Sequence, residues 1–216
     1  DFYDLFELDN GLVGVTVGDI SGKGLSAAAL TSLVKNSIRA RAVEKGTTPC
    51  DAVALADRVL YKGSAPEMFA TVFFALLDRR DGRLVYCNAG HTAGVIAQPD
   101  GAALRLPANS PIAGALEGVA FRNSETRLEF GDALFLYTDG LVEARPGPGG
   151  ELFGEDRLLE ALSRRAVARE TDLVEGVLGE VLEYSGGRLR DDVAVLEVRR
   201  TGDDSSAGTQ TKLDLT

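Results

Sequence analysis

The sequence predicts an α+β fold in which helix pairs are layered on mainly antiparallel sheets. Two turn signals indicate antiparallel pairing, because Asp9-Asn10-Gly11 and Arg80-Asp81-Gly82 each stand between two strand-like runs. The order of elements is the third observation. Two strands, two helices, about five strands, two helices and one strand follow one another, and paired helices between runs of strands are typical of helices packed on sheets.

The individual elements follow from the local pattern. The expected elements are strands 2–8 and 12–18, helices 25–42 and 49–61, strands 69–78, 83–89, 94–97, 120–129 and 133–138, helices 155–167 and 171–184, and strand 193–199. The core faces of the first two helices are expected to carry Leu30, Leu33, Val34 and Ile38, and Ala52, Leu55 and Val59, respectively. Pro- and Gly-rich loops are expected at Pro107–Leu116 and Pro146–Gly150.

Length and composition exclude several classes of protein. The chain has 216 residues, and 33 acidic against 23 basic residues give a net charge of −10. We expect one domain, residues 1–200, and a polar linker or tail, residues 201–216. The acidity argues against nucleic-acid binding. No apolar run approaches the roughly 20 residues that insertion into a membrane requires. Cys50 and Cys87 are expected to be reduced core thiols of a cytoplasmic protein.

Two aspartates are expected to face each other in the first hairpin. If Leu8 opposes Leu12 across the three-residue loop, paired residue numbers sum to 20 and Asp1 lies opposite Asp19. Like charges directly opposite each other are destabilising. A cation held between the two carboxylates explains such a pair. The alternative is a frayed hairpin end in water, where the repulsion costs little.

Further aspartates stand at the ends of apolar strands. Asp139 directly follows strand 133–138, and Asp191 and Asp192 directly precede the last strand. Because one antiparallel strand ends where its neighbour begins, Asp19, Asp139 and Asp191 are expected to converge at one edge. An all-oxygen cluster suits Mg²⁺ or Mn²⁺ and does not suit zinc. A simple Asp-Gly turn is the alternative for Asp139 taken alone.

Three other residues are weaker candidates. The stretch from Gly18 to Gly24 lacks the spacing of a P-loop. A Gly-rich turn that enters a helix nevertheless presents N–H groups to an anion. Lys23 in this turn either assists phosphate binding or is a solvated lysine. His91 is either a general acid or a turn residue. Glu143 either orients a water molecule or lies on the surface.

The same residues carry a family resemblance. Five motifs occur in order: Asp1-Phe2-Tyr3-Asp4, Gly18-Asp19-Ile20-Ser21-Gly22-Lys23-Gly24, Asn88-Ala89-Gly90-His91, Tyr137-Thr138-Asp139-Gly140-Leu141-Val142-Glu143-Ala144 and Asp191-Asp192-Val193-Ala194-Val195. In this order and spacing the chain resembles the RsbU/SpoIIE-type branch of the PPM superfamily of metal-dependent protein phosphatases. The resemblance covers residues 1 to about 199.

The resemblance implies an αββα sandwich of two mainly antiparallel sheets with helix pairs outside. It implies two Mn²⁺ or Mg²⁺ ions and hydrolysis of phosphoserine or phosphothreonine, usually on a STAS-domain anti-anti-sigma factor. Asp19 matches the ligand that bridges both metals, with the backbone carbonyl of Ile20 as a further ligand. Asp139 and Asp191 match ligands of one metal, and Asp1 matches the acidic residue near the second. Asp19, Asp139 and Asp191 would carry catalysis, and Lys23, Glu143 and Asp192 are candidates for contacts outside the ligand set or with the phosphate.

The chain departs from the family pattern in two places. The Gly-Gly pair that normally precedes Asp1 is absent, and Ser21 stands where larger PPM phosphatases carry a histidine. The resemblance also implies an upstream sensor domain that controls the phosphatase. The competing hypothesis is a catalytically weak or inactive phosphoprotein-binding module. A nucleotide cyclase fits neither the antiparallel run of strands nor the late Asp191-Asp192 pair.

Overall fold

The computed structural model describes residues 1–64, 67–202 and 213–215. The chain divides into two compact units. Unit 1 comprises Asp1–Ala93 and Pro107–Arg127, and unit 2 comprises Gly94–Leu106 and Leu128–Thr216. Each unit contains a five-stranded antiparallel sheet. The predicted antiparallel α+β organisation is therefore present in both units.

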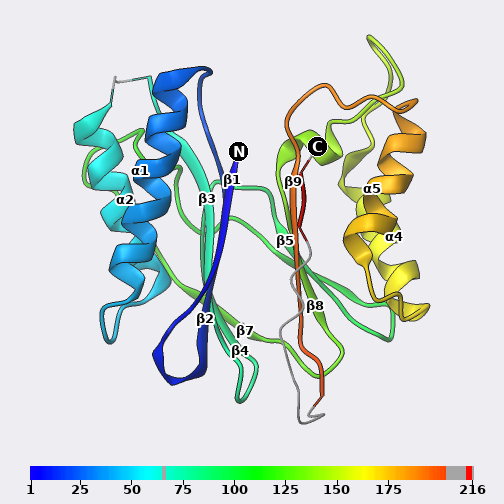
Figure 1. Ribbon diagram of the computed structural model, residues 1–216, viewed down its shortest axis with the longest axis horizontal. Coiled ribbons are helices and arrows are strands. Elements are labelled where there is room, and N and C mark those ends of the chain that lie inside the picture. Colours follow the sequence, from blue (N-terminus) through cyan, green and yellow to red (C-terminus); the bar gives the residue numbers. More distant parts are fainter. Residues whose placement is uncertain (65–66, 203–212, 216) are drawn as a thin grey trace. The chain divides into compact units, whose positions relative to one another are not determined.

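The sheet of unit 1, called sheet A, carries helices α1 and α2 side by side on one face (Figure 1). Its strands, in spatial order, are β1 (Phe2–Glu7), β2 (Leu12–Ile20), β3 (Ala70–Asp78), β4 (Arg83–Ala89) and β7 (Ser124–Arg127). A 3₁₀ turn, η1 (Asp9–Gly11), closes the first hairpin. The register pairs Phe2 with Gly18 and Glu7 with Val13, so paired numbers sum to 20 as predicted.

Helices α1 (Leu25–Ala42) and α2 (Pro49–Gly63) begin where the sequence predicted. The predicted core faces were partly wrong, because Leu33 is exposed and Leu55 and Val59 are only partly buried. The buried stripes are instead Ala27, Val34, Ile38 and Ala42 on α1, and Ala52, Val53, Ala56 and Leu60 on α2. Alanines supply much of both buried stripes, and Leu60 of α2 is fully buried with them.

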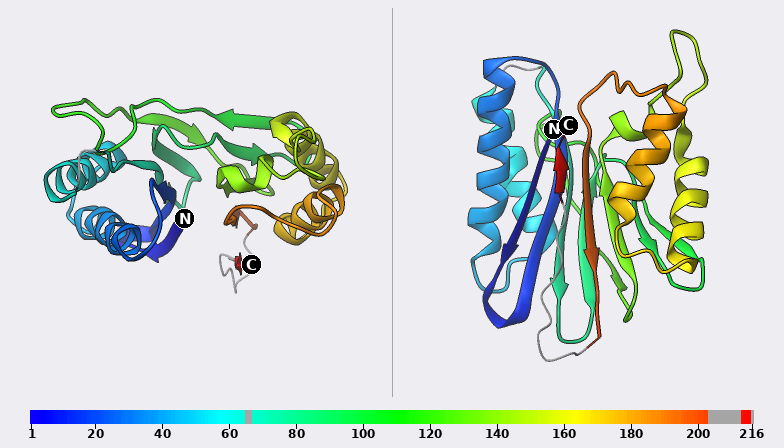
Figure 2. Two further views of the ribbon diagram at one scale, coloured as in Figure 1. Left: turned by 90° about the horizontal axis from the view of Figure 1, so that it is seen from above. Right: turned by 45° about the vertical axis from the view of Figure 1, so that its right-hand side comes forward.

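The sheet of unit 2, called sheet B, is covered on one face by helices α4 (Gly154–Val167) and α5 (Leu173–Tyr184), as Figure 2 shows. Its strands, in spatial order, are β10 (Leu213–Leu215), β9 (Ala194–Arg199), β8 (Ala133–Tyr137), β5 (Gly94–Ala97) and β6 (Ala103–Leu106). A short helix, α3 (Asp139–Val142), directly follows β8. Odd-numbered residues of β8 pack against the helix pair.

Several elements differ from the sequence-based expectation. The strand expected at 120–129 is only β7, and the edge strand β6 was missed because Leu104 and Arg105 are exposed and give no apolar alternation. Helix α3 and strand β10 were also missed. Most of the predicted linker falls on residues 203–212, which lie outside the described residues. Within the described ranges, no helix combines the length and the apolar character needed to cross a membrane.

Candidate metal centre

Asp19 stands near the end of β2, in a row of residues that point away from the helix pair. Even-numbered neighbours such as Ile20 and Val72 join the core beneath α1 and α2, so the alternation of a strand directs Asp19 to the opposite face. Its side chain is 40% exposed, and its Oδ1 atom lies 3.2 Å from the amino nitrogen of Asp1. The hairpin therefore brings Asp1 and Asp19 together at its open end.

The backbone around Asp19 is arranged for close approach. A Cβ atom on Gly18 would lie 2.5 Å from the carbonyl oxygen of Thr71 and 2.5 Å from the ring of Phe2, so only glycine fits there. Ile20 lies beyond the last β1–β2 pair. Alternation along β2 turns the carbonyl of Ile20 to the β1 side of the strand, because Ser21 already donates its N–H toward β3. This carbonyl therefore points to the side on which Asp1 lies.

The loop between β2 and α1 is held by Ser21. Its hydroxyl accepts a hydrogen bond from the N–H of Phe69 (2.9 Å) and donates to the carbonyl of Glu67 (3.4 Å). Gly22 and Gly24 adopt φ values of 98° and 86°, which favour glycine. Lys23 between them is exposed. Ser21 thus fixes the loop, and Lys23 is presented to solvent beyond Asp19.

In unit 2, Asp139 and Asp191 stand at the same end of the β8–β9 pair. Thr138 continues the ladder beyond Tyr137, with its N–H donating to the carbonyl of Ala194 (3.0 Å) and its hydroxyl accepting from the N–H of Ala194 (2.9 Å). Two residues further along, a Cβ atom on Gly140 would lie 2.3 Å from the carbonyl oxygen of Asp192. The segments that carry Asp139 and Asp191 are therefore in direct contact.

The four candidate carboxylates form two pairs, one in each unit. Asp139 and Asp191 are both exposed, and Asp191 accepts a hydrogen bond from the N–H of Asp192 (3.0 Å). Glu143 ends α3, and its N–H donates to the carbonyl of Asp139 (2.9 Å). Neither unit gathers three His, Cys, Asp or Glu side chains into a ready metal site among its described residues.

The donor set fits a hard divalent cation. Each pair offers carboxylate oxygens, and the predicted ligands include a backbone carbonyl, all of which Mg²⁺ and Mn²⁺ prefer. Both pairs lie beside a glycine that admits close backbone contact, Gly18 in unit 1 and Gly140 in unit 2. The chemistry and the local geometry of these residues therefore agree with a metal centre.

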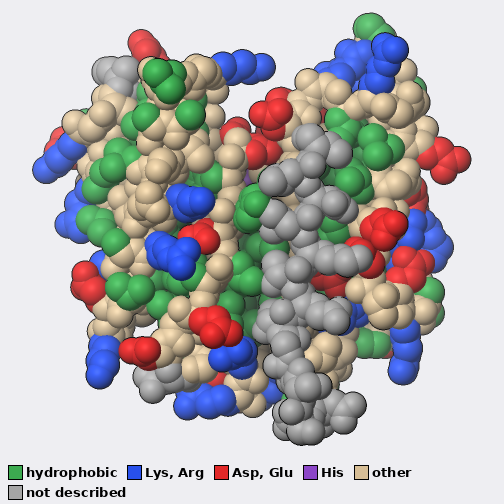
Figure 3. All heavy atoms as spheres, in the orientation of Figure 1, with side chains coloured by type: hydrophobic (Ala, Val, Ile, Leu, Met, Phe, Trp, Pro, Cys, Tyr) green, Lys and Arg blue, Asp and Glu red, His purple; other side chains and the backbone are tan. Residues whose placement is uncertain are grey.

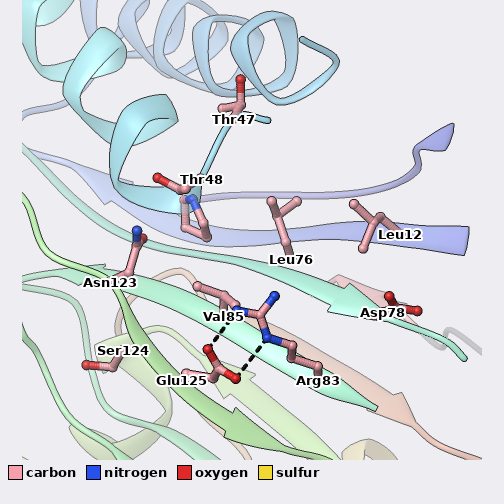
Figure 4. A pocket seen from close by; sticks show the side chains of 11 residues that line it. Leu12, Thr47, Thr48, Leu76, Asp78, Arg83, Val85, Asn123, Ser124 and Glu125 are labelled. Atoms are coloured by element: carbon pink, nitrogen blue, oxygen red, sulfur yellow. Dashed lines mark hydrogen bonds and ion pairs between the residues drawn. The ribbon is translucent and has the colours of Figure 1, made fainter. Parts of the chain in front are cut away.

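A separate cavity of about 340 Å³ lies at the other end of sheet A (Figure 4). Leu12, Leu76 and Val85 supply apolar walls. At its rim, Arg83 donates two hydrogen bonds to Glu125, at 2.8 and 2.7 Å. The charges at this cavity neutralise each other, and it contains none of the predicted ligands.

One further neighbour of Asp19 was missed by sequence reasoning. Thr71 on β3 pairs directly with Asp19, and its hydroxyl lies 2.9 Å from Nδ1 of His91. His91 lies between β4 and β5, the position that the turn interpretation predicts, but its ring contact was not foreseen. No sequence signal identifies Thr71, because cross-strand neighbours follow only from the β2–β3 register.

Comparison with known proteins identifies the family. The family model described as stage II sporulation protein E (SpoIIE) matches residues 9–201. The chain belongs to the SpoIIE family. Protein IcfG of Synechocystis sp. is 30% identical over 231 residues, covering 93% of this chain and 36% of IcfG. Phosphoserine phosphatase RsbU of Bacillus subtilis is 25% identical over 201 residues, covering 93% of this chain and 59% of RsbU. The chain thus spans about one third to three fifths of these relatives.

Solved structures confirm the fold of this SpoIIE-family chain. The SiaA-PP2C domain of Pseudomonas aeruginosa superposes with a TM-score of 0.78 at 24% identity, covering 92% of this chain and 79% of that domain. RsbX, solved in complex with magnesium, superposes with a TM-score of 0.63 at 17% identity, covering 91% of this chain and 84% of RsbX. The predicted α+β fold of PPM type is therefore confirmed.

Proposed function

We propose that residues 1–200 form a metal-dependent phosphatase domain that hydrolyses phosphoserine or phosphothreonine in proteins, with residues 201–216 as a linker or tail. One observation carries the proposal. In a SpoIIE-family chain, each unit places two aspartates at a strand end beside a glycine that admits close backbone contact. The similarity to a protein named phosphoserine phosphatase supports the same activity.

The residues would divide the work of holding two Mn²⁺ or Mg²⁺ ions. Asp19 would bridge both ions with help from the carbonyl of Ile20, Asp139 and Asp191 would hold one ion, and Asp1 would lie near the other. The ions would supply Lewis acidity to the phosphoryl oxygens and lower the pKa of the attacking water. A metal at Asp19 would also relieve the repulsion between the facing carboxylates of Asp1 and Asp19.

Other residues would prepare the site. Ser21 fixes the loop that carries Lys23, and this loop would present a positive charge to the incoming phosphate. Glu143 and Asp192 would act as outer contacts beside Asp139 and Asp191. Burial raises the pKa of Tyr137 to about 12, so this residue before Thr138 stays a neutral phenol at physiological pH. Because water is the nucleophile, in-line attack needs no covalent intermediate on the protein.

The proposal for substrate and partners rests on the family resemblance. We propose a phosphorylated STAS-domain protein as the substrate and an upstream sensor domain as the regulator. The free thiols of Cys50 and Cys87 agree with a cytoplasmic location. Burial raises the pKa of Cys87 to about 11, which keeps that thiol protonated and unreactive.

Hydrolysis of p-nitrophenyl phosphate with Mn²⁺, and with EDTA in its place, tests the proposal. We expect turnover with Mn²⁺ and its loss in EDTA. Asp139→Asn should abolish turnover while far-UV circular dichroism stays native. Asp9→Asn is the matched control, because Asp9 is an exposed aspartate at the far end of the hairpin that carries Asp19. Turnover that survives EDTA, or that survives Asp139→Asn, would contradict the proposal.

Binding without turnover would instead support the inactive-module hypothesis. A phosphorylated STAS-domain protein that binds the chain in the presence of Mn²⁺ but keeps its phosphate is the result that identifies such a module. Anomalous scattering from crystals soaked in Mn²⁺ would then locate the ions. Peaks beside Asp19, Asp139 and Asp191 are expected, and peaks only elsewhere would contradict the ligand assignment.

A further inference from the structure

His91 is held in place by the turn Asn88–Thr92, which follows β4. Its N–H donates to the side-chain oxygen of Asn88 (2.8 Å), and the side-chain amide of Asn88 donates to the carbonyl of Thr92 (3.2 Å). Gly90 has φ 70°, and a Cβ atom there would lie 2.3 Å from Cγ2 of Ile112. Two hydrogen bonds thus hold the side chain of Asn88, and there is no room for a side chain at Gly90.

The turn is also anchored to the neighbouring loop. The carbonyl of Asn88 accepts hydrogen bonds from the N–H groups of Asn109 and Ser110 (both 3.1 Å). The backbone N–H of Asn88 donates to the side-chain oxygen of Asn109 (2.9 Å). Ala89 is fully buried. These contacts leave little freedom to the His91 ring, which is only 7% exposed.

The buried ring of His91 contacts Thr71. Nδ1 of His91 lies 2.9 Å from the hydroxyl of Thr71, and Thr71 lies directly across from Asp19 in the β2–β3 register. Side chains of directly opposed residues project from the same face of a sheet with their Cβ atoms about 5 Å apart. The bond from His91 therefore fixes the rotamer of the side chain that stands beside the Asp19 carboxylate.

We propose that His91, acting through Thr71, is a positioning residue that holds the Asp19 carboxylate in the geometry needed to bind a divalent cation. The inference rests on the metal centre of the proposed function and deepens it. It assigns a role to the Asn88–His91 motif, which the ligands alone leave unexplained. Groups that orient a metal ligand typically change metal affinity by about 10- to 100-fold when they are removed.

The test compares Mn²⁺ affinity, measured by titration calorimetry, with thermal stability, measured without metal. Thr71→Val keeps the shape of the side chain and removes the hydroxyl, and we expect it to weaken Mn²⁺ binding by about tenfold. Thr16→Val is the matched control. Thr16 lies on β2, is fully buried and donates its hydroxyl to the carbonyl of Phe73 (3.0 Å). It should lose stability without losing Mn²⁺ affinity.

Conservative variants separate positioning from mere packing. Thr71→Ser keeps a hydroxyl at position 71, and His91→Asn keeps a polar atom near the place of Nδ1. Both variants should therefore retain most of the Mn²⁺ affinity of the unmodified chain. His91→Phe fills the space without the bond and should not. If Thr71→Val binds Mn²⁺ as tightly as the unmodified chain, or if Thr16→Val loses the same affinity, the positioning role is overturned.

A second readout uses the fact that His91 is the one histidine of the chain. Its ring nitrogens give a single set of NMR signals, which we expect to shift during a Mg²⁺ titration of the unmodified chain and to stay fixed in Asp19→Asn. Retained Mn²⁺ binding in Asp19→Asn would defeat the proposed metal centre itself. Loss of binding in Asp19→Asn together with full binding in Thr71→Val would defeat only the role of His91.

Discussion

The two ends of sheet A treat acidic side chains in opposite ways. At the end away from Asp19, carboxylates are matched by arginines: Glu7 with Arg79, Asp78 with Arg80, Glu125 with Arg83 and Asp81 with Arg127. At the other end, Asp1 and Asp19 face each other, and the ion pair formed by the Asp19 carboxylate is with the amino group of Asp1. Arginine side chains therefore match the acidic groups at one end of the sheet, whereas at the other end Asp19 lies beside the main-chain nitrogen of Asp1.

The difference separates surface carboxylates from site carboxylates. Acidic and basic side chains lie interspersed over the surface around α1 and α2 in Figure 3, so a carboxylate beside an arginine is the ordinary case on unit 1. A facing carboxylate pair instead repels itself unless a cation joins it. Two aspartates brought together at a strand end are therefore a better candidate for a cation site than a carboxylate that lies beside an arginine.

The largest effect is expected at Asp19. Asp19→Asn should lower Mn²⁺-dependent phosphatase activity by roughly a thousandfold, because several kcal/mol of metal-derived stabilisation would be lost. Its melting temperature without metal should stay close to that of the unmodified chain, because the contact between Asp19 and the main-chain nitrogen of Asp1 is partly exposed and contributes little. Activity and melting are measured on the same preparation. An active variant, or one that is unfolded without metal, would remove the contrast between the two ends.

The two glycines of β2 provide the next test. A Cβ atom on Gly18 would meet the backbone oxygen of Thr71 at 2.5 Å, whereas one on Gly14 would meet only the ring of Phe6, at 2.5–3.0 Å. Overpacking costs about 1–3 kcal/mol, so both Gly18→Ala and Gly14→Ala should lower the free energy of unfolding in urea. Only Gly18→Ala should also weaken Mn²⁺ binding. Equal Mn²⁺ affinity in both variants would show that the β2–β3 spacing at Gly18 does not shape the site.

Much of the fold was accessible from sequence because its signals are local. The Asp9-Asn10-Gly11 turn predicted the first hairpin register, which is observed from Phe2–Gly18 to Glu7–Val13. Asp1 and Asp19 follow directly beyond the last of these pairs, with the Asp1 nitrogen 3.2 Å from Asp19 Oδ1. The bounds of α1 were predicted to the residue. Strand β6 was missed because an exposed edge strand lacks the alternation that marks a buried one, and Leu33 was misplaced because packing of α1 against α2 decides which stripe is buried.

The site was accessible only in part. Asp139 and Asp191 flank apolar strands, so their common strand end could be inferred from antiparallel pairing, and the close contact of Gly140 with Asp192 agrees with it. Thr71 could not be found this way. Its importance depends on the β2–β3 register and on a bond from His91, and both are long-range facts that no sequence window contains.

A smaller effect, which depends on pH, is expected at the arginine-rich end. The hydrogen bond from Arg80 lowers the pKa of Asp78 below its ordinary value of 3.8. An acid with a lowered folded-state pKa stabilises the fold above pH 3.8, and this contribution is lost as the pH falls through the folded pKa. Asp78→Asn should therefore be less stable than the unmodified chain at pH 7, with the difference shrinking toward pH 3. Urea unfolding at both pH values measures this; a gap that widens at low pH would reverse the sign.

The smallest effect is expected at Arg83, on the rim of the cavity in Figure 4. Its bond to Glu125 raises the pKa of the arginine and lowers that of the glutamate. Both side chains are more than half exposed, so solvent and salt screen the pair. Arg83→Gln should leave Mn²⁺-dependent activity, Mn²⁺ affinity and the melting temperature nearly unchanged, with Glu125→Gln as its partner control. A loss of activity in Arg83→Gln at unchanged melting temperature would show that the two ends of sheet A are coupled, and charge matching would then no longer distinguish surface from site.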